Sequence, residues 1–251
     1  MVYAGIEIWA HRGRLVPGLP GNTLVDFQKA YELGVYGIET DVCFTAPDKN
    51  GSREPIIHHP DPKDCNNPKI NFLSLDNFLA FLKIHPTLSC CLEIKQEDEN
   101  LANVVVDKIT MNGLEKRVYI TSFQTKIPWL NLGTSGKVIL KAKARNPKIK
   151  THLIATFPFS LPVLARKYSP DIMSIGWLPE SKLSERFFKI FLMKTVNLKR
   201  QIKQVQDMGI KIIGGMVNDR EGFEYFANLG VNGIMTDNSV AAMEFIKTKS
   251  P

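Results

Sequence analysis

The chain has 251 residues, of which 44% are hydrophobic and 23% are charged, and its 32 Lys and Arg exceed its 25 Asp and Glu by seven. These proportions exclude a disordered chain, and no uncharged apolar run reaches the roughly 20 residues of a membrane-spanning helix. The N-terminal residues carry no basic leader before an apolar stretch. We therefore expect a cytoplasmic protein, unless a leader has been removed. The four cysteines form no CxxC pair, and we interpret them as buried thiols in a reducing compartment.

The surplus of positive charge is compatible with nucleic acid, an anionic membrane surface or a small substrate that bears phosphate. The densest basic stretch, residues 137–150, has no interleaved aromatic residues and no groove-reading motif. We therefore expect no nucleic-acid partner. The sequence does not determine the oligomeric state.

Short β-branched runs alternate with helical patterns along the whole chain. Nine runs are predicted as strands: 6–10, 35–44, 55–59, 88–95, 118–123, 151–156, 171–177, 211–218 and 231–237. Helical spacing occurs between them, for example over 23–33, 138–144 and 198–208. Since no linker or change of composition interrupts this alternation, we expect one domain of parallel βαβ units over residues 1–251.

Nine strands are one too many for an eight-stranded barrel, and a predicted turn accounts for the excess. Asn50-Gly51 is a strong hairpin signal, and the residues between strands 35–44 and 55–59 are too few for a crossover helix. If Asn50 and Gly51 are the central turn residues, Val42 faces His59. Eight parallel strands then remain, and the predicted fold is a single (β/α)8 TIM barrel with a β-hairpin insertion after the second strand.

Polar side chains gather at the predicted C-terminal ends of the first parallel strands, where such barrels place their active sites. The set comprises His11, Arg12, Glu39, Asp41, His58, His59, Glu93 and Lys95. Period-two alternation points Glu39 and Asp41 to one face of their strand, and it does the same for Glu93 and Lys95. Three carboxylates are thus expected beside the cations Arg12 and Lys95 and beside two imidazoles. These are His11 and one of the adjacent pair His58 and His59, since neighbouring strand residues face opposite sides.

Three neighbouring carboxylates repel one another unless a cation lies between them, and oxygen ligands suit Mg²⁺, Ca²⁺ or Mn²⁺ better than zinc. Arg12 and Lys95 beside such a metal would complement a phosphate group. Two histidines can supply a base and an acid. Together these residues indicate metal-assisted cleavage of a phosphodiester.

Six motifs along the chain resemble those of the glycerophosphodiester phosphodiesterases, a family of phosphatidylinositol-specific phospholipase C-like barrels. The motifs are His11-Arg12-Gly13 with Pro20-Gly21-Asn22-Thr23 (HRG…PENT), 37–42 (GxExDV), 55–59 (PVVxHD), 92–95 (xEIK), 121–123 (SSF) and 230–237 (GVDGIITD). They span residues 11–237, which is nearly the whole chain.

The resemblance implies a role for each candidate residue. By this resemblance, Glu39, Asp41 and Glu93 would bind one divalent cation, Mg²⁺ or Ca²⁺. His11 and His59 would be the catalytic pair, and Arg12 and Lys95 would contact the phosphate. His59 is preferred to His58 because the histidine of PVVxHD stands four positions after the proline. The implied reaction is hydrolysis of glycerophosphodiesters to glycerol phosphate and an alcohol by two-histidine acid–base catalysis, through a cyclic phosphate.

Three departures from the family pattern concern the substrate more than the reaction. Gly21 replaces the Glu of PENT, and Pro60 replaces the Asp of HD. The run 214–218 lacks the family's tryptophan, which either leaves more room there or makes Trp177 the aromatic wall of the substrate site instead.

Two apolar segments with cationic residues, 157–170 and 181–193, fit barrel-covering helices or a rim that contacts a membrane surface or a lysophospholipid. The alternative activities are therefore a lysophospholipase D, or a sphingomyelinase D-like phosphodiesterase or lyase acting on lysophospholipids. A non-catalytic barrel that binds phosphate or lipid is the alternative from another class of protein.

Overall fold

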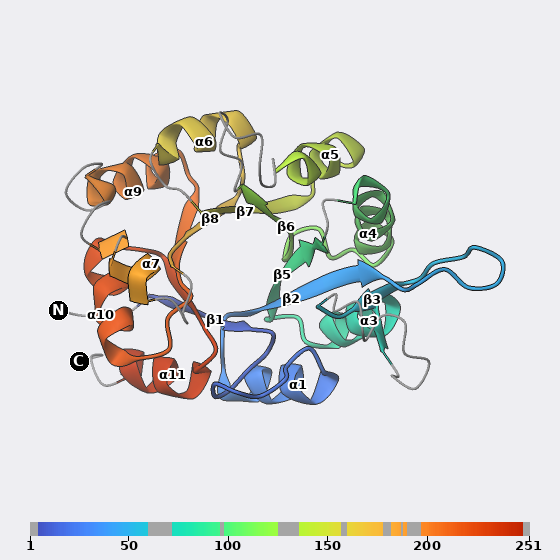
Figure 1. The fold of residues 1–251 in the computed structure, drawn as a ribbon, viewed down its shortest axis with the longest axis horizontal. Coiled ribbons are helices and arrows are strands. Elements are labelled where there is room, and N and C mark those ends of the chain that lie inside the picture. The colour runs from blue at the N-terminus through green and yellow to red at the C-terminus, as the bar shows by residue number, and fades with distance from the viewer. Residues whose placement is uncertain are drawn as a thin grey trace.

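A computed structural model of the chain contains eight parallel strands that close into a barrel, with helices around it (Figure 1). It describes residues 5–59, 72–95, 98–124, 136–156, 160–177, 182–186, 188–189 and 197–247. The barrel strands are β1 (Glu7–His11), β2 (Gly37–Phe44), β5 (Ser89–Ile94), β6 (Val118–Gln124), β7 (Lys150–Ala155), β8 (Ile172–Ile175), β9 (Lys211–Gly214) and β10 (Gly233–Thr236). Closure occurs at β1, which pairs with both β2 and β10. The predicted (β/α)8 barrel is confirmed.

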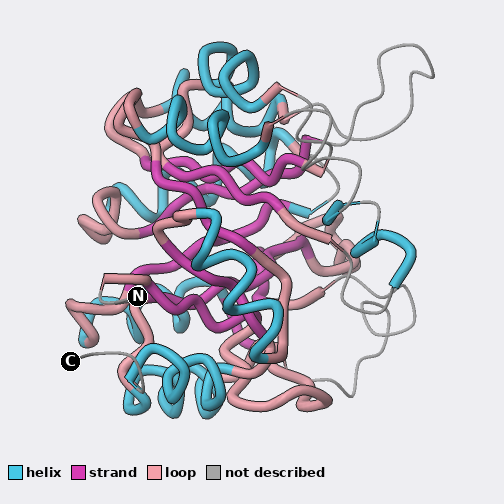
Figure 2. The backbone as a smooth tube through the Cα atoms, turned by 90° about the vertical axis from the view of Figure 1, so that its left-hand side faces the viewer, coloured by secondary structure: helices cyan, strands magenta, loops and turns pink. Residues whose placement is uncertain are grey.

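Helices follow the barrel strands in the order that a (β/α)8 barrel requires, and in side view they surround the strands (Figure 2). They are α1 (Leu24–Leu33), α3 (Leu75–Ile84), α4 (Glu99–Met111), α5 (Lys137–Arg145), α6 (Leu161–Tyr168), α7 (Lys182–Arg186), α9 (Leu198–Gln206), α10 (Arg220–Leu229) and α11 (Ser239–Lys247). Local signals set their ends: the Thr23 side chain caps the start of α1, and Gly34 ends it in the left-handed region. No helix in the described ranges is long and apolar enough to cross a bilayer.

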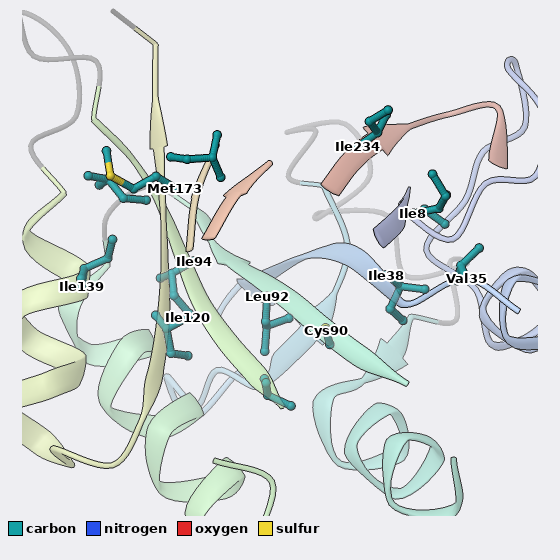
Figure 3. Packing of buried hydrophobic residues seen from close by; sticks show 14 of the residues in the cluster. Ile8, Val35, Ile38, Cys90, Leu92, Ile94, Ile120, Ile139, Met173 and Ile234 are labelled. Atoms are coloured by element: carbon teal, nitrogen blue, oxygen red, sulfur yellow. The ribbon is translucent and has the colours of Figure 1, made fainter. Parts of the chain in front are cut away.

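Alternate residues of the strands pack in two separate hydrophobic clusters. The larger cluster joins strand residues such as Ile38 and Leu92 to the helices, and Figure 3 shows part of it. The smaller cluster consists of Trp9, Cys91, Tyr119, Ile172, Ile213 and Met235. Since neighbouring strand residues face opposite sides, this smaller cluster fills the inside of the barrel. We call it the barrel floor, because the next inward residues along the strands form the candidate site.

The segment after β2 returns antiparallel to it, and its register differs from the predicted one. Val42 lies opposite Ile57 rather than His59, in a ladder that includes β3 (Pro55–Ile57). The short β4 (Leu73–Ser74), which the sequence did not indicate, pairs with β3. The cause of the shift is Asp48: its carbonyl oxygen accepts from Gly51 N, and its side chain accepts from Asn50 N and Ser52 N. The turn therefore centres one residue earlier, and Gly51 follows it with φ +78°.

The two apolar segments 157–170 and 181–193 lie partly outside the described residues, namely at 157–159, 181, 187 and 190–193. The first contributes α6, whose buried residues are Leu161, Ala165 and Tyr168. In the second, Phe188 is only 2% exposed. The described apolar residues of these segments are therefore divided: these four belong to the protein core, whereas Val163 and Leu183 are 52% and 79% exposed.

Candidate active site

The candidate site lies one inward layer above the barrel floor, toward the C-terminal ends of the strands. His11, Glu93 and Asp237 stand two positions after the floor residues Trp9, Cys91 and Met235. Glu39 joins this layer because it pairs in register with His11 across β1 and β2. Strand alternation thus brings residues from four separate strands or strand ends to one place.

Three buried carboxylates form the centre of the site. Glu39, Asp41 and Glu93 are 2%, 1% and 8% exposed, and one oxygen of each lies within 4.8 Å of the others. Asp41 and Glu93 are register partners on β2 and β5, which explains their proximity. The Glu39 Oε2 atom is buried and accepts no hydrogen bond from any residue that the structure describes. A buried carboxylate oxygen without a donor fits a site for a hard divalent cation.

Burial and mutual repulsion make ionisation of this group costly. Burial raises the pKa of Glu39 well above its ordinary value, and the charges of Asp41 and Glu93 raise it further. Burial also raises the pKa of Glu93, to about 7, against the opposing effect of Lys95. Burial acts in the same direction on Asp41, but Lys95 and Arg12 outweigh it and leave the pKa of that carboxyl below its ordinary value. The group is therefore poised to exchange protons for a cation.

Lys95 and Arg12 supply the positive charge at the site. The Lys95 ammonium lies 2.7 Å from Asp41 Oδ1 and 2.8 Å from Glu93 Oε1, and Arg12 Nε lies 3.1 Å from Asp41 Oδ2. Burial lowers the pKa of Lys95, but Glu93 and Asp41 raise it more, so the amine stays protonated. Three carboxylates against two cations leave one formal negative charge uncompensated within this group. That imbalance also favours a bound cation.

A glycine turn brings a further polar residue to Asp41. Asn22 donates through Nδ2 to Asp41 Oδ2 at 3.2 Å and accepts from Thr40 Oγ1 at 2.7 Å. Gly21 adopts φ +72°, and a Cβ atom there would lie 2.7 Å from the Arg12 carbonyl oxygen. In this turn, which positions Asn22, a side chain such as the glutamate of the family motif would therefore clash with Arg12.

His11 is oriented by Asp237 from the far end of the chain, which Arg14 holds in place. Its Nδ1 lies 2.8 Å from Asp237 Oδ1, and Arg14 donates to the same oxygen at 2.9 Å. Burial raises the pKa of Asp237, but the contacts with His11 and Arg14 outweigh it and lower the pKa below its ordinary value. An ionised Asp237 accepts a hydrogen bond from Nδ1–H of His11. The proton-accepting nitrogen of the ring is then Nε2, which lies 3.6 Å from Glu39 Oε2. Nε2 is thus available for proton transfer beside the carboxylates.

The two hairpin histidines have different surroundings. The His58 backbone N–H donates to the Asp41 carbonyl at 3.0 Å, and the His58 ring packs on Phe72. His59 is exposed, yet partial burial lowers its pKa; the charge of Asp41 raises the pKa, and the charges of Lys95 and Arg12 lower it. Charged groups of the candidate site thus act on the His59 imidazole. Pro60 and the residue after it lie outside the described residues.

Trp177 lies in an aromatic cluster outside the barrel interior. Its ring stacks on Phe226 of α10 at 5.0 Å and contacts Phe188 and Tyr225. Lys189 lies 5.3 Å above it and pairs with Glu185 and Glu221. The described contacts of Trp177 are therefore with α10 and residues 188–189, and none of them joins it to the three carboxylates.

Sequence reasoning assigned no role to Asp237, Arg14 and Asn22. Asp237 and Asn22 belong to the motifs at 230–237 and 20–23, so a signal for them was present in the sequence. Arg14 follows the HRG motif directly and carries no signal of its own.

A parallel (β/α)8 barrel with three buried carboxylates and an aspartate-bound histidine at its mouth is the architecture that the structure defines. No protein-family model matches the chain. Lysophospholipase D GDPD3 of Mus musculus is 22% identical, over 64% of this chain, and the chain spans about half (50%) of that protein's length.

Solved structures share the fold over almost the whole chain. A glycerophosphodiester phosphodiesterase from Parabacteroides distasonis has a TM-score of 0.73 at 16% identity, covering 97% of this chain and 98% of that one. One from Thermotoga maritima has a TM-score of 0.62 at 17% identity, covering 97% and 98%. An Oleispira antarctica phosphodiesterase in complex with the product sn-glycerol-3-phosphate has a TM-score of 0.65 at 14% identity, covering 96% of each chain. In fold, the chain resembles the glycerophosphodiester phosphodiesterases.

Proposed function

We propose that the protein is a metal-dependent glycerophosphodiester phosphodiesterase that releases glycerol phosphate and an alcohol. The observation that carries the proposal is the buried group of Glu39, Asp41 and Glu93, whose ligand oxygens lie within 4.8 Å of one another beside Lys95 and a positioned His11. The shared fold with glycerophosphodiester phosphodiesterases supports this choice among the reactions that such a site could perform.

The three carboxylates would hold one divalent cation, Mg²⁺ or Ca²⁺, which when bound supplies positive charge to a phosphate oxygen. Arg12 and Lys95 add to this charge and stabilise the extra negative charge that develops on the phosphoryl oxygens. Both cations already lie on Asp41, so a phosphate would share them with that carboxylate.

His11 and His59 are the proposed acid and base. One imidazole accepts the proton of the glycerol hydroxyl beside the phosphate as its oxygen attacks phosphorus. The other donates a proton to the leaving alcohol oxygen as its bond to phosphorus breaks. Water then opens the cyclic phosphate with the two roles exchanged, so the overall reaction consumes one water. In His11 the reacting nitrogen is Nε2, because Asp237 holds Nδ1.

The test is turnover of glycerophosphocholine and glycerophosphoethanolamine with Mg²⁺ or Ca²⁺, and with a chelator as the control. We expect divalent-dependent release of glycerol phosphate. Phosphorus NMR of the products distinguishes ring-opened phosphate from an enzyme that stops at the cyclic ester. A protein that turns over neither diester with either metal contradicts the proposal.

A lysophospholipase D activity is the second candidate, because the mouse protein that matches part of the chain carries that name. A parallel assay with lysophosphatidylcholine measures it directly. Phe188 of the apolar segment 181–193 packs on Trp177, and Trp177 packs on Phe226 of α10. Faster turnover of the lysophospholipid than of glycerophosphocholine would favour this second activity.

A further inference from the structure

A chain of three buried polar side chains crosses the inside of the barrel next to the carboxylates. Thr121 of β6, the register partner of Glu93, lies with its hydroxyl oxygen 3.1 Å from His152 Nδ1. His152 Nε2 lies 2.6 Å from the Ser174 hydroxyl on β8. Thr121 and His152 are fully buried, and Ser174 is 7% exposed. The chain therefore begins at the register partner of Glu93 and ends at Ser174, its one slightly exposed member.

Ser174 lies in the same inward layer as the candidate site. It stands two positions after the floor residue Ile172, just as Glu93 stands two positions after Cys91 and His11 two after Trp9. On β8 it is the residue before the last, as Glu93 is on β5. The Ser174 hydroxyl is thus placed at the same depth as the carboxylates, on the far side of Thr121 and His152.

We assign the directions of these hydrogen bonds from the protons that each group can supply. The Thr121 hydroxyl donates to the Tyr119 carbonyl oxygen, so its only proton is used, and it accepts from His152 Nδ1–H. Burial lowers the pKa of His152 to about 3, so the ring is neutral and has one N–H only. His152 Nε2 is then an acceptor, and the Ser174 hydroxyl donates to it. Ser174 Oγ keeps its lone pairs as acceptors for a donor at the barrel mouth.

We infer that Ser174 is a specificity residue that accepts a hydrogen bond from an alcohol group of the substrate, namely the glycerol hydroxyl that does not attack phosphorus. Thr121 and His152 are positioning residues, since they fix the direction of the Ser174 hydroxyl without touching the substrate. This inference rests on the proposed function for the identity of the alcohol. A group that offers acceptor lone pairs selects a ligand with a hydroxyl over one that lacks it.

The experiment compares two ligands by calorimetry in the presence of Mg²⁺ or Ca²⁺: glycerol 3-phosphate and propane-1,2-diol 1-phosphate. The second ligand keeps the hydroxyl beside the phosphate and lacks only the terminal one. The wild-type protein should bind glycerol 3-phosphate about three- to tenfold more tightly, which is the effect of one uncharged hydrogen bond. Ser174→Ala should bind the two ligands with similar affinity. Ser174→Cys, which keeps most of the volume but accepts hydrogen bonds poorly, should behave in the same way.

Ser122→Ala is the matched control, because it removes a buried hydroxyl from the opposite face of β6 and should keep the wild-type preference. Equal affinity of the wild-type protein for the two ligands, no binding of either, or a preference that persists in both Ser174 variants would overturn the inference. Because the measurement needs no turnover, it is separate from the test of the proposed reaction. Selective binding of glycerol 3-phosphate without diester cleavage would support the proposed role of Ser174 and contradict the proposed function.

Discussion

His11 Nδ1 and Asp237 Oδ1 lie 2.8 Å apart, although 226 positions separate the two residues in the chain. The barrel produces this contact because its first strand and its last strand pair with each other, with Ala10 opposite Thr236. Closure of the barrel is thus what sets the orientation of the His11 imidazole. Arg14 binds the same aspartate oxygen, and Asn218 accepts from the Asp237 backbone N–H, so Asp237 is itself held in place.

We expect Asp237→Asn to lower kcat for glycerophosphodiesters by about tenfold to a hundredfold, with a smaller change in KM. An amide cannot accept from His11 as a carboxylate does, so the free nitrogen of the imidazole is no longer fixed as Nε2. Steady-state kinetics measure the effect. Arg14→Gln is the control, since it removes the ion pair with Asp237 and leaves the His11 contact, and it should cost less. Equal losses in the two variants would mean that Asp237 acts only through folding.

The two hairpin histidines can be distinguished by alanine substitutions. Loss of a catalytic acid or base typically costs about 10²- to 10⁴-fold in rate, so His59→Ala should lose at least about a hundredfold. His58→Ala should lose less than about tenfold, because the His58 ring packs on Phe72. Turnover of glycerophosphocholine at saturating metal measures both. A larger loss in His58→Ala than in His59→Ala would exchange the two assignments.

Strand alternation was enough to predict the carboxylate group, because Glu39 and Asp41 on one strand and Glu93 on the next must share a face. The hairpin register could not be predicted in the same way. It depends on the Asp48 side chain, which binds two backbone N–H groups and moves the turn centre by one residue. Paired positions then shift by two, so that Val42 faces Ile57.

Contacts between distant segments could not be predicted from the sequence either. The polar chain of Thr121, His152 and Ser174 joins three strands, and only the barrel register brings it together. Thr121 belongs to the motif at 121–123, but His152 and Ser174 belong to none of the six motifs. The outward packing of Trp177 depends on Phe226 of α10, which lies 49 positions later in the chain.

Metal binding should stabilise the fold measurably. A ligand that binds only the native state adds about 2.7 kcal/mol to the free energy of unfolding at a hundred times its Kd. We therefore expect Mg²⁺ or Ca²⁺ to raise the thermal midpoint of the wild-type protein and a chelator to reverse this. Glu39→Gln should abolish the metal-dependent rise. Asp76→Asn, which changes a surface acid paired with Lys108, should retain it. An equal metal response of Glu39→Gln and the wild-type protein would place the cation elsewhere.

The affinity for the metal should increase with pH around neutrality. The pKa of Glu93 is raised to about 7, and that of Glu39 is raised as well, so these carboxyls bind protons that the cation must displace. For one group with a pKa of 7, the ionised fraction rises about tenfold between pH 6 and pH 8. Titration calorimetry at the two pH values should show about this tightening, with proton release at pH 6. A pH-independent Kd would contradict the model of protonated ligands.

His152 should contribute a pH dependence to the stability of the fold. Its folded-state pKa of about 3 lies below the unfolded value of about 6.5, so the unfolded state binds more protons between these pH values. The contribution of His152 to stability is therefore full above about pH 6.5 and is lost as the pH falls toward 3. Between pH 7 and pH 5 this contribution falls by about 2 kcal/mol. Glu93, whose pKa is raised to about 7, acts in the opposite direction over the same interval, so the effect of His152 is measured as a difference between two proteins. Urea unfolding at both pH values should show that the wild-type protein loses about 2 kcal/mol more than His152→Gln, which cannot take up the proton. Identical changes in the two proteins would mean that His152 is already charged in the fold.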